Sequence, residues 1–226
     1  CRQLTSITFE ATSKLTSIST SMFWDCSNFT SIEIPASVTS IDHSAFRYCR
    51  TLATVIFEPN SQLTSIGSDA FQSCAQLTSI TFEATSILAS IGSSTFSSSA
   101  LTSIEIPASV ITIGSAAFFG TSSLTSVSFA SGIQLESIGI DVFKQTGLTS
   151  IEIPASVTSI GNNAFRECSG LTSIAIPASV LTIGSSAFYS TSSLASVTFA
   201  SGSQLQSIGG YAFYQSGLTS IAIPAS

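Results

Sequence analysis

The chain has 226 residues, of which only 8% are charged, and its 6 basic and 12 acidic residues give a net charge of -6. Because roughly 25% is typical of soluble domains, Ser and Thr hydroxyls must supply most of the polar surface. The few basic residues argue against binding of nucleic acid, which needs a clustered basic face. No apolar run approaches the roughly 18 residues that cross a bilayer, so no membrane span is predicted.

An internal repeat organises the chain. One clear copy, residues 148–170, reads LTSIEIPASVTSIGNNAFRECSG. Repeats start near positions 4, 29, 52, 77, 101, 124, 148, 171, 194 and 218, so that each unit has 23 to 25 residues. Near-constant spacing is typical of a solenoid in which each unit forms one coil. We therefore predict a single solenoid over residues 1–226, with about nine to ten coils and no long helices. Since the sequence begins and stops within a unit, we expect it to be a fragment that lacks its caps.

Each unit opens with a segment in which apolar and polar residues alternate, as in residues 148–153. This period of two predicts a strand, and stacked units would place these strands about 4.8 Å apart in one parallel sheet. In several units Pro follows the strand and ends it, because Pro has no N–H for the ladder. These prolines are Pro35, Pro107, Pro154, Pro177 and Pro224. In the remaining units the strand ends in Phe, as at Phe57, and a different connection follows.

A second, shorter alternation follows in each unit, as in residues 157–160, and predicts a parallel strand on the opposite wall. Gly often comes next, as at Gly161, and we interpret it as a bend that needs unusual backbone angles. One Phe per unit comes after this bend and predicts a stacked aromatic spine. The spine residues are Phe23, Phe46, Phe71, Phe96, Phe118, Phe143, Phe165, Phe188 and Phe213.

The pattern LxxIxIPxSVxxIGxxAFxxC, with its 23-residue spacing, resembles the BspA-like leucine-rich repeats, also called the Treponema pallidum type, of bacterial and protist surface proteins. The resemblance covers the whole chain. It implies an all-β-rich solenoid, curved or flattened, that is exported to the cell surface and adheres to host or matrix proteins. Several units depart from the family pattern, because they carry Phe where the family has Ile-Pro or Leu-Pro.

The cysteines occupy one register of the repeat. Cys26, Cys49, Cys74 and Cys168 lie three residues after a spine Phe, and Cys1 fits the same register. Other units hold Ser or Thr there, so we interpret these cysteines as small, packed free thiols. Disulfides between neighbouring coils are the alternative, since equivalent Cα atoms would be about 4.8 Å apart. Zinc is not predicted, because there is no C-x-x-C pair and only 1 His.

The sequence favours a protein without catalytic activity or cofactor. A catalytic His43 would need a partnered nucleophile and an orienting acid in a pocket, so we interpret it as an isolated surface histidine. Glu33, Glu105 and Glu152 share one outward position of the first strand. The closest pair would be roughly 10 Å apart, as a regular array gives by chance.

Two surfaces are candidates for binding. The residue after the spine Phe varies more than its neighbours and is often Trp, Tyr or Arg, the types that dominate binding hot spots. A turn that tolerates any side chain would explain the same variation. The candidate partner-binding residues are Trp24, Arg47, Phe119, Lys144, Arg166, Tyr189 and Tyr214 in this column and Glu33, Glu105 and Glu152 on the strand face.

These observations favour a non-enzymatic, cell-surface or secreted scaffold that binds protein or glycan on host cells or matrix. A structural segment of an extracellular fibre or cell-wall coat is the alternative, with end-to-end self-association through exposed strand edges. Ice binding by ranks of Ser and Thr is a smaller alternative, weakened by Ile56 and the three glutamates on that face. A sequon at Asn28 predicts glycosylation only for a protein secreted by a eukaryote.

Overall fold

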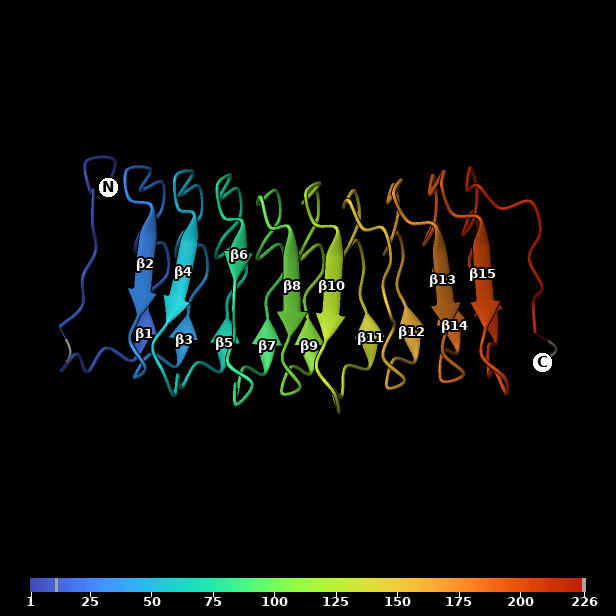
Figure 1. The fold of residues 1–226 in the computed structure, drawn as a ribbon, viewed down its shortest axis with the longest axis horizontal. Helices are drawn as coiled ribbons and strands as arrows, with labels where there is room; N and C mark the ends of the chain where they lie inside the picture. Colours follow the sequence, from blue (N-terminus) through green and yellow to red (C-terminus); the bar gives the residue numbers. More distant parts are fainter. Residues whose placement is uncertain (11, 225–226) are drawn as a thin grey trace.

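The computed structural model describes residues 1–10 and 12–224. Its coils lie side by side along one long axis, with the chain ends at opposite ends of that axis (Figure 1). Two strand positions per coil form two walls, which we call the strand wall and the second wall. The strand wall contains β2 (Ser31–Ile34), β4 (Thr54–Phe57), β6 (Ser79–Ile80), β8 (Ser103–Ile106), β10 (Ser126–Phe129), β13 (Ser173–Ile176) and β15 (Ser196–Phe199). The second wall contains β1 (Ser17–Ile18), β3 (Ser40–Ile41), β5 (Ser65–Ile66), β7 (Ser90–Ile91), β9 (Thr112–Ile113), β11 (Ser137–Ile138), β12 (Ser159–Ile160), β14 (Thr182–Ile183) and β16 (Ser207–Ile208).

The strands pair in parallel and join equivalent residues of successive coils, such as Ser31 with Thr54 and Ser17 with Ser40. Exposed and buried residues alternate along β2 and β8, as the period of two predicts. No helix occurs within residues 1–10 and 12–224, and so none is long and apolar enough to span a membrane. The predicted parallel β-solenoid without long helices is confirmed.

The prediction of one continuous sheet on the strand wall is wrong. This wall divides into the sheets β2-β4-β6, β8-β10 and β13-β15. Its breaks fall before the units that carry Pro107, Pro154 and Pro177, whereas each unit that ends its strand in Phe pairs with the coil before it. Residues 150–153 lie between two such breaks and form no strand. Pro therefore does more than end a strand: it removes the amide that would pair with the preceding coil.

The glycine after the second strand does not supply unusual backbone angles, so that interpretation is also wrong. Gly67 and Gly161 are not among the residues with positive φ. A Cβ atom on Gly67 would lie 2.7 Å from the carbonyl carbon of Asp42 in the preceding coil, and one on Gly161 would lie 2.7 Å from that of Gly139. Glycine is needed in these coils because the backbones of neighbouring coils approach too closely for a side chain, although Asp42 itself fills the equivalent position of its own unit.

Left-handed backbone instead flanks the spine Phe. The residues two before and two after it have positive φ, as in Ala116 (58°) and Gly120 (67°) around Phe118. Most of these residues are not glycine, for example Asp141 (56°) and Glu167 (60°). The paired left-handed residues make two tight bends, and between them lies the segment that we call the turn wall.

The predicted aromatic spine is confirmed. Successive rings from Phe23 to Phe213 are stacked, with centroid separations of 5.2 to 5.6 Å. The rings from Phe46 to Phe188 are fully buried. They pack with the inward Leu, Ile and Val side chains of both strand walls in one continuous core.

The cysteines are free thiols, and Cys26, Cys49, Cys74 and Cys168 are buried. The disulfide alternative is therefore not formed. The Sγ atom of Cys49 donates to the carbonyl oxygen of Phe23 in the preceding coil at 3.0 Å, and Cys168 donates likewise to Phe143 at 2.9 Å. Thr121 fills the same slot elsewhere and donates to Phe96 at 2.9 Å, whereas the buried hydroxyl of Ser99 in this slot has no partner, so the slot requires a small side chain.

Candidate functional site

The turn wall holds its side chains in register through its own backbone ladder. The amide nitrogen of Phe118 donates to the carbonyl oxygen of Val142 at 3.0 Å, and that of Phe143 donates to Ala164 at 2.9 Å. Equivalent bonds link the other turns. Because each turn is fixed to the next one, the residues that follow the spine Phe form a line along the solenoid. We call this line the edge column: Trp24, Arg47, Gln72, Ser97, Phe119, Lys144, Arg166, Tyr189 and Tyr214.

The C-terminal part of the edge column is a row of aromatic and cationic contacts. The Nζ atom of Lys144 lies 5.3 Å from the ring centroid of Phe119, and the Cζ atom of Arg166 lies 4.5 Å from that of Tyr189. The rings of Tyr189 and Tyr214 are stacked at 5.4 Å. Cation–π contacts at exposed sites contribute about 0.5–1 kcal/mol each, so these contacts help to fix the positions of the side chains.

Carboxylates position the two cations of this row. Asp141 Oδ1 lies 3.5 Å from Lys144 Nζ, and Glu167 Oε1 accepts from Arg166 Nε at 3.0 Å. Glu167 Oε2 also accepts from Gln145 Nε2 at 2.6 Å. The hydrogen bonds from Gln145 and Arg166 lower the pKa of Glu167. The side chains of Lys144 and Arg166 remain 23% and 33% exposed, so both cations are partly accessible.

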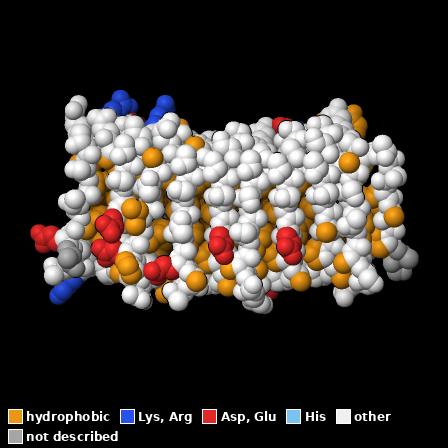
Figure 2. All heavy atoms as spheres, viewed as in Figure 1, with side chains coloured by type: hydrophobic (Ala, Val, Ile, Leu, Met, Phe, Trp, Pro, Cys, Tyr) orange, Lys and Arg blue, Asp and Glu red, His pale blue; other side chains and the backbone are white. Residues whose placement is uncertain are grey.

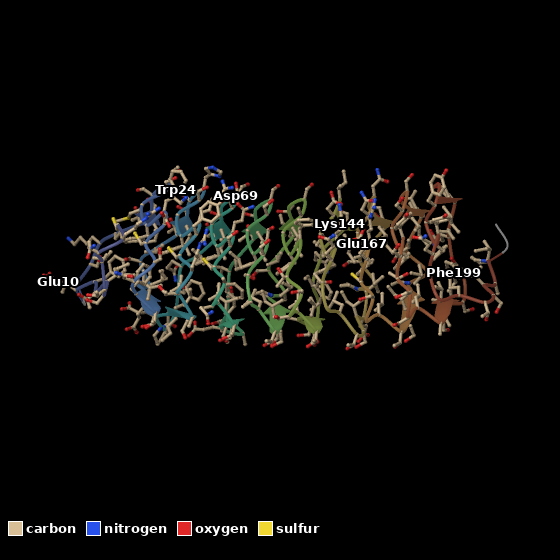
Figure 3. The ribbon with its side chains drawn as sticks, turned by 90° about the horizontal axis from the view of Figure 1, so that it is seen from above. Glu10, Trp24, Asp69, Lys144, Glu167 and Phe199 are labelled. Carbon is tan, nitrogen blue, oxygen red and sulfur yellow. The ribbon has the colours of Figure 1, made fainter. Side chains whose placement is uncertain are left out.

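The edge column is not uniform along its length. Ser97 is only 4% exposed, whereas Trp24 is 52% exposed. Arg47 packs over the ring of Tyr48 at 5.0 Å and lies 3.9 Å from Asp69 Oδ2. The predicted column therefore consists of two patches, around Trp24 and Arg47 and around residues 119–214, with smaller side chains between them. Figure 3 shows Trp24, Asp69, Lys144 and Glu167 in succession along the solenoid.

The sequence reasoning missed four residues that hold this column in place: Tyr48, Asp69, Asp141 and Glu167. All four occupy the left-handed positions two residues before or after a spine Phe. The signal for them in the sequence is their register, because each lies two residues before or after a spine Phe.

The predicted glutamates lie on a different wall. Glu33, Glu105 and Glu152 are exposed and point outward from the strand wall. In Figure 2 several acidic side chains lie over the strands and others at the ends and margins of the view, whereas the visible basic side chains lie at the margins. The structure thus divides the predicted residues between two surfaces and does not bring the glutamates together with the edge column.

His43 is not the isolated histidine that we predicted. Its Nε2 atom lies 3.2 Å from Ser44 Oγ, and its Nδ1 atom lies 3.7 Å from Asp69 Oδ2. A serine hydroxyl, a histidine ring and an aspartate carboxylate follow one another in this order in the catalytic triad of a hydrolase. However, Ser44 is only 4% exposed, and Asp69 also lies 3.9 Å from Arg47. A buried hydroxyl cannot meet a substrate carbonyl, so the cluster serves to link two coils. No group of three or more metal-binding side chains gathers in the part of the chain that the structure describes.

Coils with a strand wall, a second wall and an aromatic spine define a leucine-rich repeat solenoid. The BspA type leucine rich repeat region matches residues 1–88, 57–170 and 89–219, with six copies. The chain belongs to this family.

Solved structures share the fold. The chain is similar to the Treponema pallidum leucine-rich repeat protein TpLRR, with 27% identity, a TM-score of 0.61 and coverage of 70% of this chain and 72% of that one. It also resembles a leucine-rich cell surface protein of Faecalibacterium prausnitzii, with 24% identity, a TM-score of 0.51 and coverage of 76% and 61%. The pneumococcal vaccine antigen PcpA gives 23% identity and a TM-score of 0.53, over 89% of this chain and 54% of the antigen. Curated proteins gave no match.

Proposed function

We propose that this chain is a non-enzymatic, protein- or glycan-binding scaffold of the cell surface, and that it takes its ligand on the edge column. The observation that supports this proposal is the row from Phe119 to Tyr214, in which each large side chain contacts a neighbour. Such a row presents aromatic and cationic groups that are already ordered, so binding loses little side-chain entropy.

The composition of the row suits a polar ligand with acceptor groups. The side chains of Arg166 and Lys144 remain partly exposed beside their carboxylates, and Tyr189 and Tyr214 add aromatic surface. Arg and Tyr are among the residues that most often dominate binding energy. A cell-surface location fits this role and the name of the Faecalibacterium relative, which is described as a leucine-rich cell surface protein.

Binding to a panel of matrix glycoproteins and glycans tests the proposal. The variant Arg166→Ser/Tyr189→Ser interrupts the row, and we expect it to weaken saturable binding at least tenfold. The variant Ile87→Ser/Ile111→Ser is the matched control, because these two side chains are exposed elsewhere on the solenoid. Circular dichroism and unfolding by urea should show that both variants remain folded.

Binding that survives the edge-column variant would disprove the location of the site. Loss of binding in Glu33→Gln/Glu105→Gln/Glu152→Gln would then assign the ligand to the strand wall. If the chain binds nothing and forms filaments instead, the scaffold proposal fails and the fibre alternative replaces it.

A further inference from the structure

Two guanidinium groups gather around one tyrosine on the turn wall, in the coil between those of Trp24 and Asp69, which Figure 3 labels. The Cζ atoms of Arg47 and Arg50 lie 5.0 Å and 5.9 Å from the ring centroid of Tyr48. The Nη2 atom of Arg47 also donates to the hydroxyl oxygen of Tyr48 at 3.3 Å. We call these three residues the arginine cluster. A coil lies on each side of it, so the solenoid holds it from both directions.

The backbone of Tyr48 is unfavourable for an aromatic residue. Its φ is 63°, in the left-handed region, where a bulky side chain is rarely found. Other coils hold Asp, Ser, Gly, Gln or Glu at this position, two residues after the spine Phe. Strained residues of this kind cluster at functional sites. Here the ring that requires the strain is the one that holds both guanidinium groups.

Arg50 has no ion-pair partner among the described residues, and it is exposed. Asp25 is occupied by Arg2, whose Nε atom donates to its Oδ2 atom at 2.8 Å. The pKa of Asp25 is lowered first by this hydrogen bond and to a smaller extent by the charge of Arg50. Asp69 lies 3.9 Å from Arg47. The guanidinium group of Arg50 can therefore donate two parallel hydrogen bonds to the carboxylate of a ligand.

Hydroxyl groups continue the surface beside the arginine cluster. Ser73 and Ser98 occupy the position of Tyr48 in the next two coils and share its left-handed backbone. The turns pair with one another through their amide and carbonyl groups, so most of these backbone groups are not available to a peptide. Side-chain hydroxyls suit the hydroxyl groups of a sugar ring, because both donate and accept hydrogen bonds. The surface therefore favours a glycan over a peptide.

The charge of the whole molecule limits the number of negative charges on the ligand. The sequence has 12 acidic and 6 basic residues, and Asp25, Asp42 and Asp69 belong to the same coil as the arginine cluster or to its neighbours. A polymer with a negative charge on every sugar is repelled by these carboxylates, since like charges across an interface oppose binding. A single carboxylate can meet Arg50 without placing further negative charges against the solenoid.

We propose that the arginine cluster binds the carboxylate of a single acidic sugar at the end of a glycan, with Arg50 as the hydrogen-bond donor and Ser73 beside the sugar ring. The inference rests on the proposed function, since it takes the chain to be a binding scaffold, but it adds a separate site around Tyr48. Sialic acid and the uronic acids share this carboxylate chemistry, so the experiment includes both.

Oligosaccharides with one acidic sugar at the end test the proposal. A fluorescent oligosaccharide that ends in sialic acid and another that ends in glucuronic acid are titrated with the protein, and we expect saturable binding of at least one. The same compound with its carboxyl group reduced to an alcohol should bind at least tenfold more weakly. Absence of binding to both acidic compounds, equal binding of the reduced compound, or binding of densely sulfated heparin alone overturns the proposal.

Variants place the sugar on the solenoid. Arg50→Gln removes the charge of the donor at an exposed position, so it should weaken binding at least tenfold in a folded chain. Tyr48→Ser removes the ring that holds both guanidinium groups and should weaken binding at least threefold, and Ser73 shows that serine fits this backbone. Lys14→Gln, at an exposed residue outside the turn wall, removes one positive charge and is the matched control. Unchanged binding in either cluster variant, or an equal loss in the control, overturns the proposal.

The edge-column variant Arg166→Ser/Tyr189→Ser separates this inference from the proposed function. It should keep its affinity for the acidic oligosaccharide and lose its affinity for the ligand of the row from Phe119 to Tyr214. If it loses the acidic oligosaccharide and Arg50→Gln keeps it, the arginine cluster is not the site and the proposed function stands. If Arg50→Gln alone loses the oligosaccharide and no ligand depends on Arg166 and Tyr189, only the proposed location of the main site fails.

Discussion

The amide nitrogen of Ala130 donates to the carbonyl oxygen of Ile106 at 2.9 Å, and one coil later the position of Ala130 is occupied by Pro154. The same bond recurs from Glu58 to Ile34 at 3.0 Å and from Ala200 to Ile176 at 2.9 Å. Each of these amides belongs to a unit whose strand ends in Phe. One residue per unit thus decides whether this bond to the preceding coil can form on the strand wall.

Replacement of Ala130 by Pro should separate β10 from β8. The change removes the donor to Ile106 and leaves its carbonyl oxygen without a partner, which costs about 1–3 kcal/mol. Unfolding by urea measures the loss, and hydrogen exchange should show faster exchange of the β10 amides. Ala130→Ser keeps the amide and is the control. Equal stability of the Pro and Ser variants would contradict this role of the amide.

Truncation of one spine ring should destabilise the solenoid strongly. Phe118 is fully buried and stacks on Phe96 at 5.5 Å and on Phe143 at 5.4 Å. Phe118→Ala should cost about 3–5 kcal/mol. Since each coil contacts only its neighbours, faster hydrogen exchange should be concentrated in the coils on either side.

The adjacent residue provides the control for this prediction. Phe119 lies in the edge column and is partly exposed, so Phe119→Ala should cost much less than Phe118→Ala. A similar loss of stability in both variants would mean that the spine has no special role in the core.

The fold was predictable from the sequence because its causes are local and repeated. Alternating Leu, Ser and Ile predict strands, and one Phe per unit predicts the spine. The interruption of the sheet was only partly predictable. The sequence shows that Pro154 has no N–H to donate. That this N–H would have reached the carbonyl oxygen of Phe129 is known only once the register between coils is known. The glycine interpretation was wrong because the close approach of Gly67 to Asp42 depends on the packing of two coils.

The sequence predicts which position of the repeat the candidate site residues occupy, but it does not predict which side chains they contact. The position after the spine Phe identifies Lys144 and Arg166. It does not reveal that Glu167 orients Arg166 or that Ser97 is buried, since both depend on how side chains from neighbouring coils meet.

The buried thiols should respond slowly to reagents. Cys1 is exposed, whereas Cys49 and Cys168 are buried. A thiol-specific reagent at pH 8 should therefore modify Cys1 at once and the buried thiols only as fast as the coils open. Mass spectrometry after limited labelling would identify the modified residues. Rapid labelling of Cys49 in the folded chain would contradict its burial.

The same thiols predict a loss of stability at alkaline pH. Burial raises the pKa of the Cys49 thiol to about 12 and that of the Cys168 thiol to about 11, whereas an unfolded thiol ionises near pH 8.5. Their contribution to stability is therefore complete below pH 8.5 and is lost as the pH rises toward 11 to 12. Urea unfolding from pH 7 to 10.5 should show a steeper loss for the wild type than for Cys49→Thr/Cys168→Thr. Parallel curves would exclude the thiols as the cause.

Replacement of Ala116 by Gly should stabilise the chain, although Gly usually destabilises ordered structure. Ala116 has a φ of 58°, and its Cβ atom makes this left-handed backbone unfavourable by about 1–2 kcal/mol. Gly removes that strain but has a greater entropy in the unfolded chain, which costs about 0.5–1 kcal/mol. We expect a net gain of about 0.5–1 kcal/mol in the free energy of unfolding.

Ala117 is the matched control, because it is the next residue, is fully buried and has no positive φ. Ala117→Gly removes a buried methyl group, which costs about 0.8 kcal/mol, and adds the same unfolded-state entropy. The two variants should therefore shift the urea midpoint in opposite directions. A loss of stability in both would show that the left-handed turn of this coil is not strained by its alanine, and that the bend before Phe118 is stabilised by contacts of the Ala116 methyl group.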